Sequence, residues 1–284
     1  MPLIDAAGHR IACTQAGTGP AVVLLHGYVG DGEATWHPQL RGLRDNLTVV
    51  AWDDPGAGGS SDPPESLGLS GYAGALAVFL TRLGLTRPHL MGLSFGAKLA
   101  LEFCTRHPER VQTLSLVSAY AGWRGSLGED LANTRLVQAM QLSELPAAEF
   151  VDSLLPTMFR SGTPQPVVQH FADSMRSLHP VGFRAMARAS AGDLREVLPQ
   201  VQVPTLVIAS TDDARAPLTV AMVIHAAIAG SRLVVIPTPA TCATRTGGSV
   251  QRDRARVPVR AHPLTWALPP SRTEVSTVDR PSWT

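Results

Sequence analysis

The chain has 284 residues, of which 44% are apolar and 17% charged, and its formal net charge is +1. This composition is typical of a globular protein with one large core, and it lacks the basic excess that favours nucleic acid. Residues 1–17 contain no apolar signal segment, and no stretch reaches the roughly 18 apolar residues of a membrane span. We therefore expect a cytoplasmic protein that binds neither nucleic acid nor a membrane.

The three cysteines, Cys13, Cys104 and Cys242, are odd in number and scattered along the chain. Their spacing fits neither a disulfide framework nor a metal or redox motif, so buried or idle thiols are expected. No other group of residues has the spacing of metal ligands. The sequence predicts no cofactor and no metal, and it leaves the oligomeric state open.

Apolar runs alternate with helical patterns through most of the chain, which predicts an α/β fold with a mainly parallel sheet. Runs without polar alternation suit strands that are covered on both faces. Strands are predicted at 21–25, 47–52, 88–92, 111–117, 204–209 and 232–236, with antiparallel edge strands at 1–4 and 10–15. Helices are predicted at 36–45, 70–84, 95–107 and 217–229.

The strand signals stop between the fourth and fifth predicted parallel strands. Residues 119–203 instead carry proline-punctuated helical patterns, at 129–145, 147–155, 165–178 and 181–197. We interpret this segment as a helical cap over the site. Its methionines and phenylalanines either pack within the cap or form an apolar wall for a substrate. The predicted division is a core of 1–118 and 204–236, a cap of 119–203 and an atypical, irregular tail of 237–284.

The segments that follow two of the predicted strands carry recognisable patterns. His26-Gly27-Tyr28 follows the run 21–25, and this H-G-x pattern supplies an oxyanion-hole N–H, here that of Tyr28. His26 is expected to shape this loop rather than to transfer protons. Asp53 and Asp54 begin a Gly-rich turn that ends at Ser60. They could act as an acid/base pair, but their Gly/Pro setting favours a role in the turn.

The strand at 88–92 leads into Gly92-Leu93-Ser94-Phe95-Gly96, and a helix follows. A strand, G-x-S-x-G and a helix together form a nucleophile elbow, in which glycines are needed because the serine sits on a tight, strained turn. The helix that follows directs N–H groups, among them that of Phe95, toward an oxyanion beside Ser94. Ser94 is therefore the predicted nucleophile.

The chain resembles the α/β-hydrolase family over residues 1–236. The resemblance rests on the motifs His26-Gly27, Asp53-x-Pro55-Gly56-x-Gly58-x-Ser60, Gly92-x-Ser94-x-Gly96 and His107-Pro108-Glu109-Arg110-Val111. The chain is similar in particular to esterases and lactonases of the 3-oxoadipate enol-lactonase type. The resemblance implies a sheet of the eight-stranded type with an inserted cap, and a Ser…Asp…His triad.

The family's acid sits four residues before a proline, which here selects Asp213 over Asp212 because of Pro217. Capping of the helix near Pro217 is the structural alternative for these aspartates. The family's base follows the last strand, usually as Gly-His, but residues 237–244 contain no histidine. His225 lies within a predicted helix, where packing or solvation explains it, and His262 would need a long loop to reach the site.

The tail of residues 237–284 holds seven prolines and seven arginines against three acids, and it lacks the family's terminal helix. Loss of that helix would expose apolar sheet surface. Synonymous codons for 239–242, shifted by two bases, encode Gly-His-Val. Codons for 250–258, shifted by one base, encode the amphipathic peptide Phe-Asn-Ala-Thr-Val-Arg-Ala-Phe. We hypothesise that the tail is a frameshifted hydrolase terminus.

The sequence thus indicates a serine hydrolase of small carboxylic esters or lactones, with an acyl-enzyme at Ser94 and a small-molecule substrate as its partner. Tyr28 and Phe95 would stabilise the oxyanion and Asp213 would orient a base. The alternative is a catalytically silent protein of the same fold, either a pseudoenzyme or a small-molecule binder.

Overall fold

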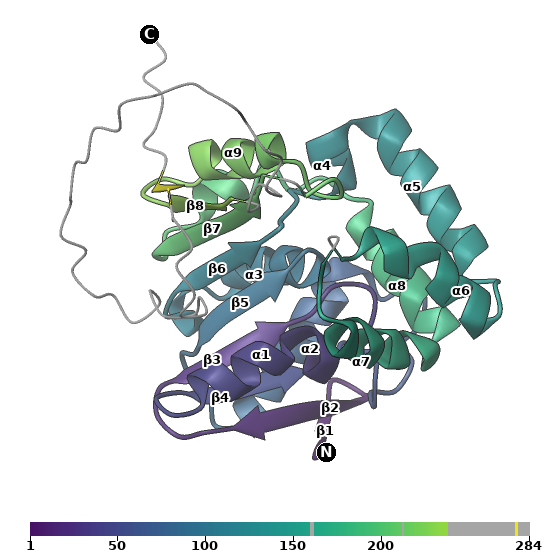
Figure 1. The fold of residues 1–284 in the computed structure, drawn as a ribbon. Helices are drawn as coiled ribbons and strands as arrows, with labels where there is room; N and C mark the ends of the chain where they lie inside the picture. Colours follow the sequence, from purple (N-terminus) through teal and green to yellow (C-terminus); the bar gives the residue numbers. More distant parts are fainter. Residues whose placement is uncertain (160–161, 212, 238–275, 278–284) are drawn as a thin grey trace, which may run out of the picture.

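The structure is a computed structural model that describes residues 1–159, 162–211, 213–237 and 276–277 (Figure 1). The described strands form one nine-stranded sheet in the order β1-β2-β4-β3-β5-β6-β7-β8-β9. Strands β3 to β8 run parallel to one another, whereas β1 pairs antiparallel with β2, β2 with β4, and β9 with β8. The strands are β1 (Leu3–Ala6), β2 (His9–Ala16), β3 (Ala21–Leu25), β4 (Thr48–Trp52), β5 (His89–Leu93), β6 (Leu114–Val117), β7 (Thr205–Ser210), β8 (Arg232–Ile236) and β9 (Ser276–Thr277).

The predicted α/β fold with a mainly parallel sheet is confirmed, and three of its local differences have a plain cause or place. Strand β6 begins three residues later than predicted, because the Val111 N–H bonds to Pro108 O and closes a 3₁₀ turn. Helix α1 begins at Gly32, because the Asp31 side chain accepts the Ala34 N–H and caps it. The third difference is β9, which adds a strand within the segment expected to be irregular.

Helices cover both faces of the sheet, as the uninterrupted apolar strands require. Helix α1 (Gly32–Leu43) packs on one face, and α2 (Gly68–Arg82), α3 (Phe95–Arg106) and α9 (Leu218–Ala227) belong to the larger core on the other. The alternation of β3 shows this division, since Val22 and Leu24 join the α1 core whereas Val23 and Leu25 join the larger one. None of the helices in the described part combines the length and apolar character that crossing a membrane requires.

Three apolar side chains beside the α1 core are only half-buried. They are Leu93, Val117 and Ile208, at neighbouring positions on β5, β6 and β7. A helix following the last parallel strand would cover such a surface. The predicted loss of that helix concerns residues 238–275, which lie outside the described part of the chain.

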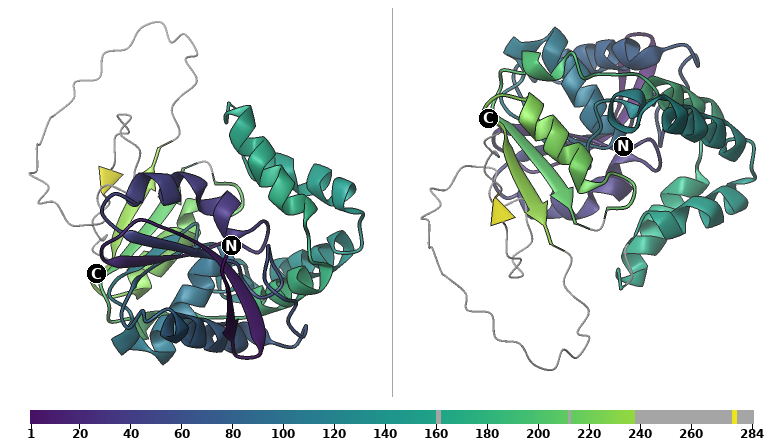
Figure 2. Two further views of the ribbon diagram at one scale, coloured as in Figure 1. Left: turned by 90° about the horizontal axis from the view of Figure 1, so that it is seen from below. Right: turned by 90° about the horizontal axis from the view of Figure 1, so that it is seen from above.

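Five helices lie between β6 and β7 and gather to one side of the sheet (Figures 1 and 2). They are α4 (Trp123–Leu127), α5 (Glu129–Leu142), α6 (Ala147–Leu154), α7 (Gln165–Arg176) and α8 (Pro180–Ser190), and we call them the cap helices. Helix α4 is too short for periodicity to reveal. The cap meets the core closely at Gly56, where a Cβ would lie 2.3 Å from the Cα of Gly182.

Candidate functional site

The candidate site lies where the parallel strands end, because ligands of α/β sheets bind beyond the carboxyl ends of the strands. His26 follows β3, Asp53 and Asp54 follow β4, Ser94 follows β5 and Asp213 comes shortly after β7. Because all four strands are parallel, these residues come from the same edge of the sheet. The cap helices follow β6 in the chain, and β6 ends at this same edge of the sheet.

Ser94 adopts the strained conformation of an elbow. Its φ of 51° and ψ of −102° are unusual for a residue with a side chain. The turn is held by the Ser94 N–H, which donates to Val117 O at 2.9 Å, and by the Lys98 N–H, which donates to Ser94 O at 3.2 Å. Ser94 is partly exposed, between the half-buried Leu93 and the buried Phe95. These backbone contacts hold Ser94 in a tight turn at the carboxyl end of β5.

The two elbow glycines, Gly92 and Gly96, are fixed by close backbone packing. A Cβ on Gly92 would lie 2.2 Å from Gly96 O, and a Cβ on Gly96 would lie 2.1 Å from Leu25 O and 2.6 Å from His26 O. The contacts of Gly96 place the start of α3 directly against the segment of His26 and Gly27, which we call the oxyanion loop. The elbow and the loop of His26 and Gly27 are therefore neighbours in space, as the motifs predict.

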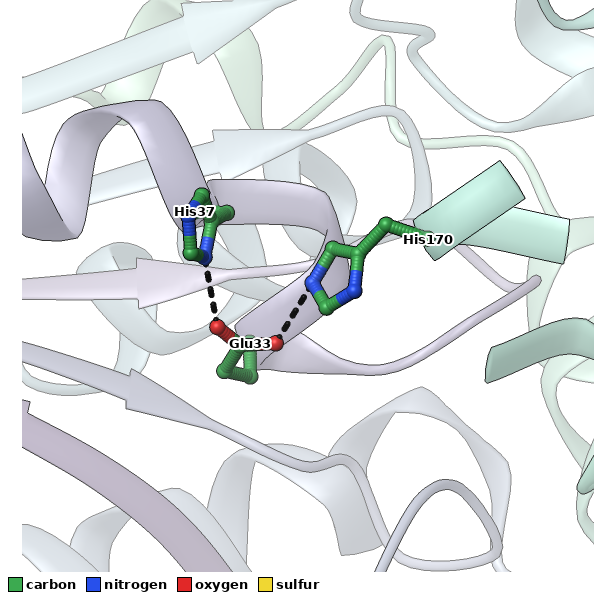
Figure 3. A group of neighbouring side chains, drawn as sticks. All are labelled: Glu33, His37 and His170. Atoms are coloured by element: carbon green, nitrogen blue, oxygen red, sulfur yellow. Dashed lines mark hydrogen bonds and ion pairs between the residues drawn. The ribbon is translucent and has the colours of Figure 1, made fainter. Parts of the chain in front are cut away.

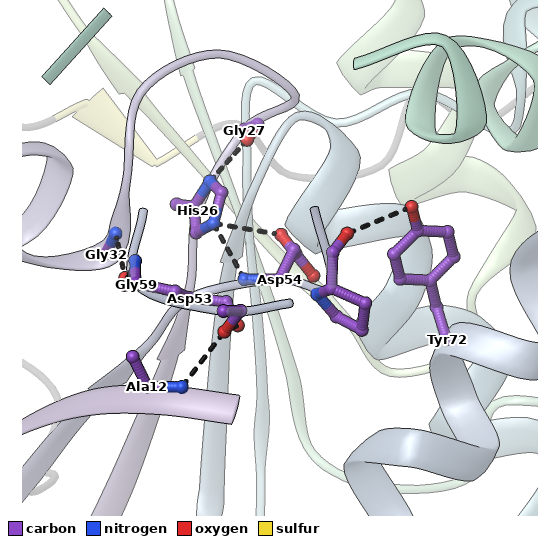
Figure 4. Close-up of polar contacts among 10 residues, drawn as sticks. Ala12, His26, Gly27, Gly32, Asp53, Asp54, Gly59 and Tyr72 are labelled. Carbon is purple, nitrogen blue, oxygen red and sulfur yellow. Dashed lines mark hydrogen bonds and ion pairs between the residues drawn. The ribbon is translucent and has the colours of Figure 1, made fainter. Parts of the chain in front are cut away.

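The oxyanion loop is held by the His26 side chain, which is fully buried (Figure 4). His26 Nδ1 lies 2.5 Å from Gly27 O, and the Asp54 N–H donates to Nε2 at 3.0 Å. These partners assign the Nδ1–H tautomer, in which the ring joins the oxyanion loop to the turn after β4. This arrangement supports the expected shaping role of His26.

The backbone N–H groups of Tyr28 and Phe95 donate to no other described residue. The Phe95 ring is buried against Tyr72, with ring centroids 5.1 Å apart. The Tyr28 ring stacks on Phe183 of α8 at 5.2 Å and meets the edge of Trp123 at 5.9 Å. Free N–H groups on neighbouring segments suit an oxyanion hole, and the Tyr28 ring also reaches the cap.

Asp53 and Asp54 have different surroundings although they are adjacent. Asp53 accepts the N–H groups of Gly32 and Gly59 at 2.9 and 2.8 Å, which supports its expected role in the turn. The Asp54 carboxyl is buried without a hydrogen-bond donor, and its Oδ2 lies 3.2 Å from His26 Nε2. Burial raises the pKa of Asp54 to about 7, against the opposing effect of His26. Asp54 is thus a titratable group that turn chemistry alone does not explain.

Asp213 closes the turn that precedes α9. Its Oδ1 accepts the N–H groups of Arg215 and Ala216 at 3.0 and 2.8 Å. Its Oδ2 takes part in no hydrogen bond among the described residues, so the carboxylate keeps one oxygen for another partner. Capping of the turn before α9, the structural alternative for Asp213, therefore explains only one of the two carboxylate oxygens. Asp212 lies outside the described residues.

No described residue hydrogen-bonds to Ser94 Oγ. His225 is buried on α9, and its Nδ1 lies 2.8 Å from Ser231 Oγ, in agreement with a packed role. His179, on the cap, lies 2.7 Å from Asp62 Oδ1 and 3.1 Å from Gly58 O. His262 lies outside the described residues. The base of a triad is therefore missing from the described part of the chain.

A small hollow opens between the oxyanion loop, the turn after β4 and cap helices α7 and α8. Its walls include Tyr28, Gly58 and His179. From the apolar side chains considered for a substrate wall, Met175, Phe183 and Met186 line it. The cap therefore contributes an apolar side to the region beside the oxyanion loop.

A second histidine group joins the core to the cap (Figure 3). Glu33 Oε1 lies 2.7 Å from His37 Nδ1 on α1, and its Oε2 lies 2.8 Å from His170 Nε2 on α7. The ligand atoms of the three residues lie within 4.8 Å of one another. Their types suit a divalent transition metal, but the three side chains also satisfy one another directly. The spacing of residues along the sequence does not predict this group, because His170 is 137 positions away from Glu33.

A sequence profile of the family described as alpha/beta hydrolase fold matches residues 20–240. Over 200 residues the chain is 29% identical to a poly(3-hydroxyalkanoate) depolymerase of Ectopseudomonas oleovorans, which covers 69% of each protein. The chain is also 37% identical over 112 residues to an uncharacterized protein of Mycobacterium tuberculosis. That match spans only 33% of the mycobacterial protein's length.

Solved structures share the fold over most of the chain. A thermophilic esterase from Thermogutta terrifontis, with malate bound, superposes with a TM-score of 0.75 at 26% identity and covers 84% of this chain and 90% of its own. An enol-lactonase from Burkholderia xenovorans LB400 gives a TM-score of 0.74 at 24% identity, covering 83% of this chain and 91% of its own. The second likeness is one of fold alone.

Proposed function

The chain belongs to the alpha/beta-hydrolase fold family, and we propose that it is a serine-dependent hydrolase of small carboxylic esters or lactones, acting through an acyl-enzyme at Ser94. The observation that carries this proposal is the backbone of Ser94, held at a φ of 51° between two glycines that no larger residue could replace. Strain of this kind persists where the surrounding structure enforces it, typically at a nucleophile.

The oxyanion would be stabilised by the N–H groups of Tyr28 and Phe95, which donate to no other residue in the described part of the chain. Ser94 Oγ would attack the carbonyl carbon, and negative charge would develop on the carbonyl oxygen beside these donors. The positive end of α3 adds to the same field, since Phe95 is its first residue. Two names among the relatives, an esterase and a polyester depolymerase, support ester cleavage.

Asp213 would orient the base, through the carboxylate oxygen that the turn leaves unused. A serine hydroxyl needs such a base to lose its proton at neutral pH. We propose that the histidine belongs to the terminus encoded in the shifted reading frame, as Gly-His-Val directly after β8. The chain as it stands would then retain only the part of catalysis that an elbow and an oxyanion hole supply.

The second candidate function is a catalytically silent protein that binds a small molecule beneath the cap. One observation favours it: no described residue hydrogen-bonds to Ser94 Oγ. The oxyanion hole and the hollow beside Tyr28 would then serve binding alone.

A fluorophosphonate probe and p-nitrophenyl acetate distinguish the two candidates. An enzyme is expected to show stable labelling at Ser94 and turnover, and Ser94→Ala is expected to lose both. Weak labelling without turnover would fit an elbow that lacks its base. If well-folded protein shows no labelling and no turnover, the hydrolase proposal is overturned.

A further inference from the structure

One partly exposed carboxylate has two histidines as its partners. Glu33 Oε1 lies 2.7 Å from His37 Nδ1, and Glu33 Oε2 lies 2.8 Å from His170 Nε2. Among the described residues, no other carboxylate has two histidines within ion-pair distance, and no lysine or arginine pairs with Glu33. The Glu33 carboxylate is therefore next to groups that can ligate a metal ion, and not next to fixed positive charges.

The first two members of this group lie on one face of α1. Glu33 and His37 are four residues apart, which is the spacing at which two side chains of a helix reach the same metal ion. The Gly32 N–H donates to Asp53 Oδ1 at 2.9 Å and so fixes the first turn of α1 to the segment after β4. The backbone that carries Glu33 is thus held independently of its side chain.

The third member comes from the cap. His170 lies on α7, and the next residue, Phe171, packs against the loop before α1, where a Cβ on Gly30 would lie 2.9 Å from Phe171 Cε2. The Phe171 ring also meets the Phe159 ring edge-on, with centroids 5.4 Å apart. This packing holds the helix that carries His170 beside the start of α1.

The two imidazole rings are directed at a common point (Figure 3). Their centroids are 5.1 Å apart and their planes are inclined by 66°, so the rings do not stack. One nitrogen of each ring points at the Glu33 carboxylate, and the three ligand atoms lie within 4.8 Å of one another. Around a tetrahedral zinc ion, ligand atoms at bond lengths of about 2.0–2.1 Å lie about 3.3 Å apart. The observed contacts of 2.7 and 2.8 Å would therefore widen by about half an ångström to admit the ion.

Solvent reaches all three side chains. The exposed fractions are 33% for Glu33, 43% for His37 and 44% for His170. Side chains with this exposure can shift by a fraction of their own width, and an ion can enter directly from water. The same access leaves a fourth coordination position to water, as in zinc sites with three protein ligands.

We propose that Glu33, His37 and His170 form a site for a divalent transition metal of the zinc type, which links α1 of the core to α7 of the cap. Imidazole nitrogens suit zinc, nickel and copper, whereas magnesium and calcium prefer ligand sets made of oxygen. His37 would coordinate through Nδ1 and His170 through Nε2, and each neutral ring would carry its proton on the other nitrogen. The site uses neither Ser94 nor Asp213, so it is independent of the proposed hydrolase function.

Titration of the chelator-treated full chain with zinc chloride tests the site. Calorimetry is expected to show zinc binding that Glu33→Gln, His37→Ala and His170→Ala each weaken by about 100-fold or more, since loss of even a supporting residue around a metal costs about 10–100-fold. Magnesium chloride is the ionic control and is expected not to bind. Unchanged zinc affinity in any of the three variants, or no zinc binding by the wild-type chain, would overturn the site.

His179→Ala is the matched control. His179 is also a cap histidine paired with a carboxylate, that of Asp62 at 2.7 Å, but no third ligand joins this pair in the described part of the chain. This variant should bind zinc as the wild type does. The three altered ligands are partly exposed, so their variants are expected to fold, which circular dichroism checks. An equal loss of zinc binding in His179→Ala would show that the variants act through the cap rather than through coordination, and would contradict the proposal.

Amide hydrogen exchange tests the link between the two helices. Zinc is expected to slow exchange in α7 of the wild-type chain and not in that of His170→Ala. Because α7 also supplies Met175 to the hollow beside the oxyanion loop, slower exchange would mean that the ion fixes one wall of that hollow. Zinc binding that leaves exchange in α7 unchanged would overturn the link.

Discussion

The two sides of the candidate site are held by different means. On the elbow side, Ser94 and the oxyanion loop are fixed by backbone contacts that leave no room for a side chain at Gly92 or Gly96. On the β7 side, Asp213 is fixed through one oxygen, and Arg215 hydrogen-bonds to the Tyr28 and Thr157 hydroxyls. The elbow side is thus held by contacts within the described chain, whereas on the β7 side one Asp213 oxygen accepts no hydrogen bond from a described residue.

The two sides of the site therefore depend on different parts of the chain. A strained turn is maintained by its immediate neighbours in the sheet, so it persists when other parts of the protein change. A base and a substrate are held by side chains from distant segments, so they depend on every one of those segments.

Supplying a base should have the largest effect on activity. A chain in which the residues after β8 are replaced by the terminus of the shifted frame should hydrolyse p-nitrophenyl acetate with a kcat/KM about 10²–10⁴-fold higher. Asp213→Asn should remove most of that gain, because the histidine would lose its orienting partner. An unchanged kcat/KM in a folded replacement chain would show that the β7 side does not await a histidine.

Adding one methyl group at the elbow should cause a large loss of stability. Gly96→Ala places a Cβ 2.1 Å from Leu25 O, so the backbone must move, and we expect about 3 kcal/mol of the unfolding free energy to be lost. Urea denaturation measures the change. Gly74→Ala is the control, since a Cβ there meets nothing within 4 Å and an α2 alanine should be neutral or stabilising. Equal effects would show that close packing does not fix the elbow.

The buried Asp54 should make stability depend on pH. Its pKa is raised from 3.8 to about 7 in the folded protein, so the folded state binds more protons between these values. Stability due to this group is therefore lost as pH rises from about 4 to about 7, by on the order of 4 kcal/mol. Asp54→Asn should flatten the slope of the unfolding free energy between pH 5 and 8. The exposed control Asp45→Asn should keep the wild-type slope.

Glu33 should show the smallest effect, with the opposite sign. Partial burial would raise its pKa, but the hydrogen bonds with His37 and His170 prevail and lower it below 4.5. Its contribution is therefore present above that value and lost as pH falls through the lowered folded pKa. We expect Glu33→Gln to cost at most about 1 kcal/mol at pH 6, because the pairs are partly exposed, and less toward pH 4. A larger cost in urea unfolding would show that the cap depends on this contact.

Much of the fold follows from patterns within short stretches of the sequence. The parallel strands and the helices between them were predicted from apolar periodicity, because each is buried over its own length. Helix α4 and the start of α1 were missed, since five residues are too few for a periodic signal and the Asp31 cap is a side-chain contact. The Glu33–His170 contact could not be predicted because it joins residues 137 positions apart.

From the sequence alone we predict the nucleophile elbow and the oxyanion loop, and no histidine directly follows the last parallel strand in it. These features depend on residue types at fixed short spacings, where glycine is required by a local turn. The tertiary contacts add that Asp54 is buried beside His26 and that Arg215 hydrogen-bonds to the Tyr28 hydroxyl. The charge and solvation of a side chain depend on segments distant in the sequence, and folding alone brings them together.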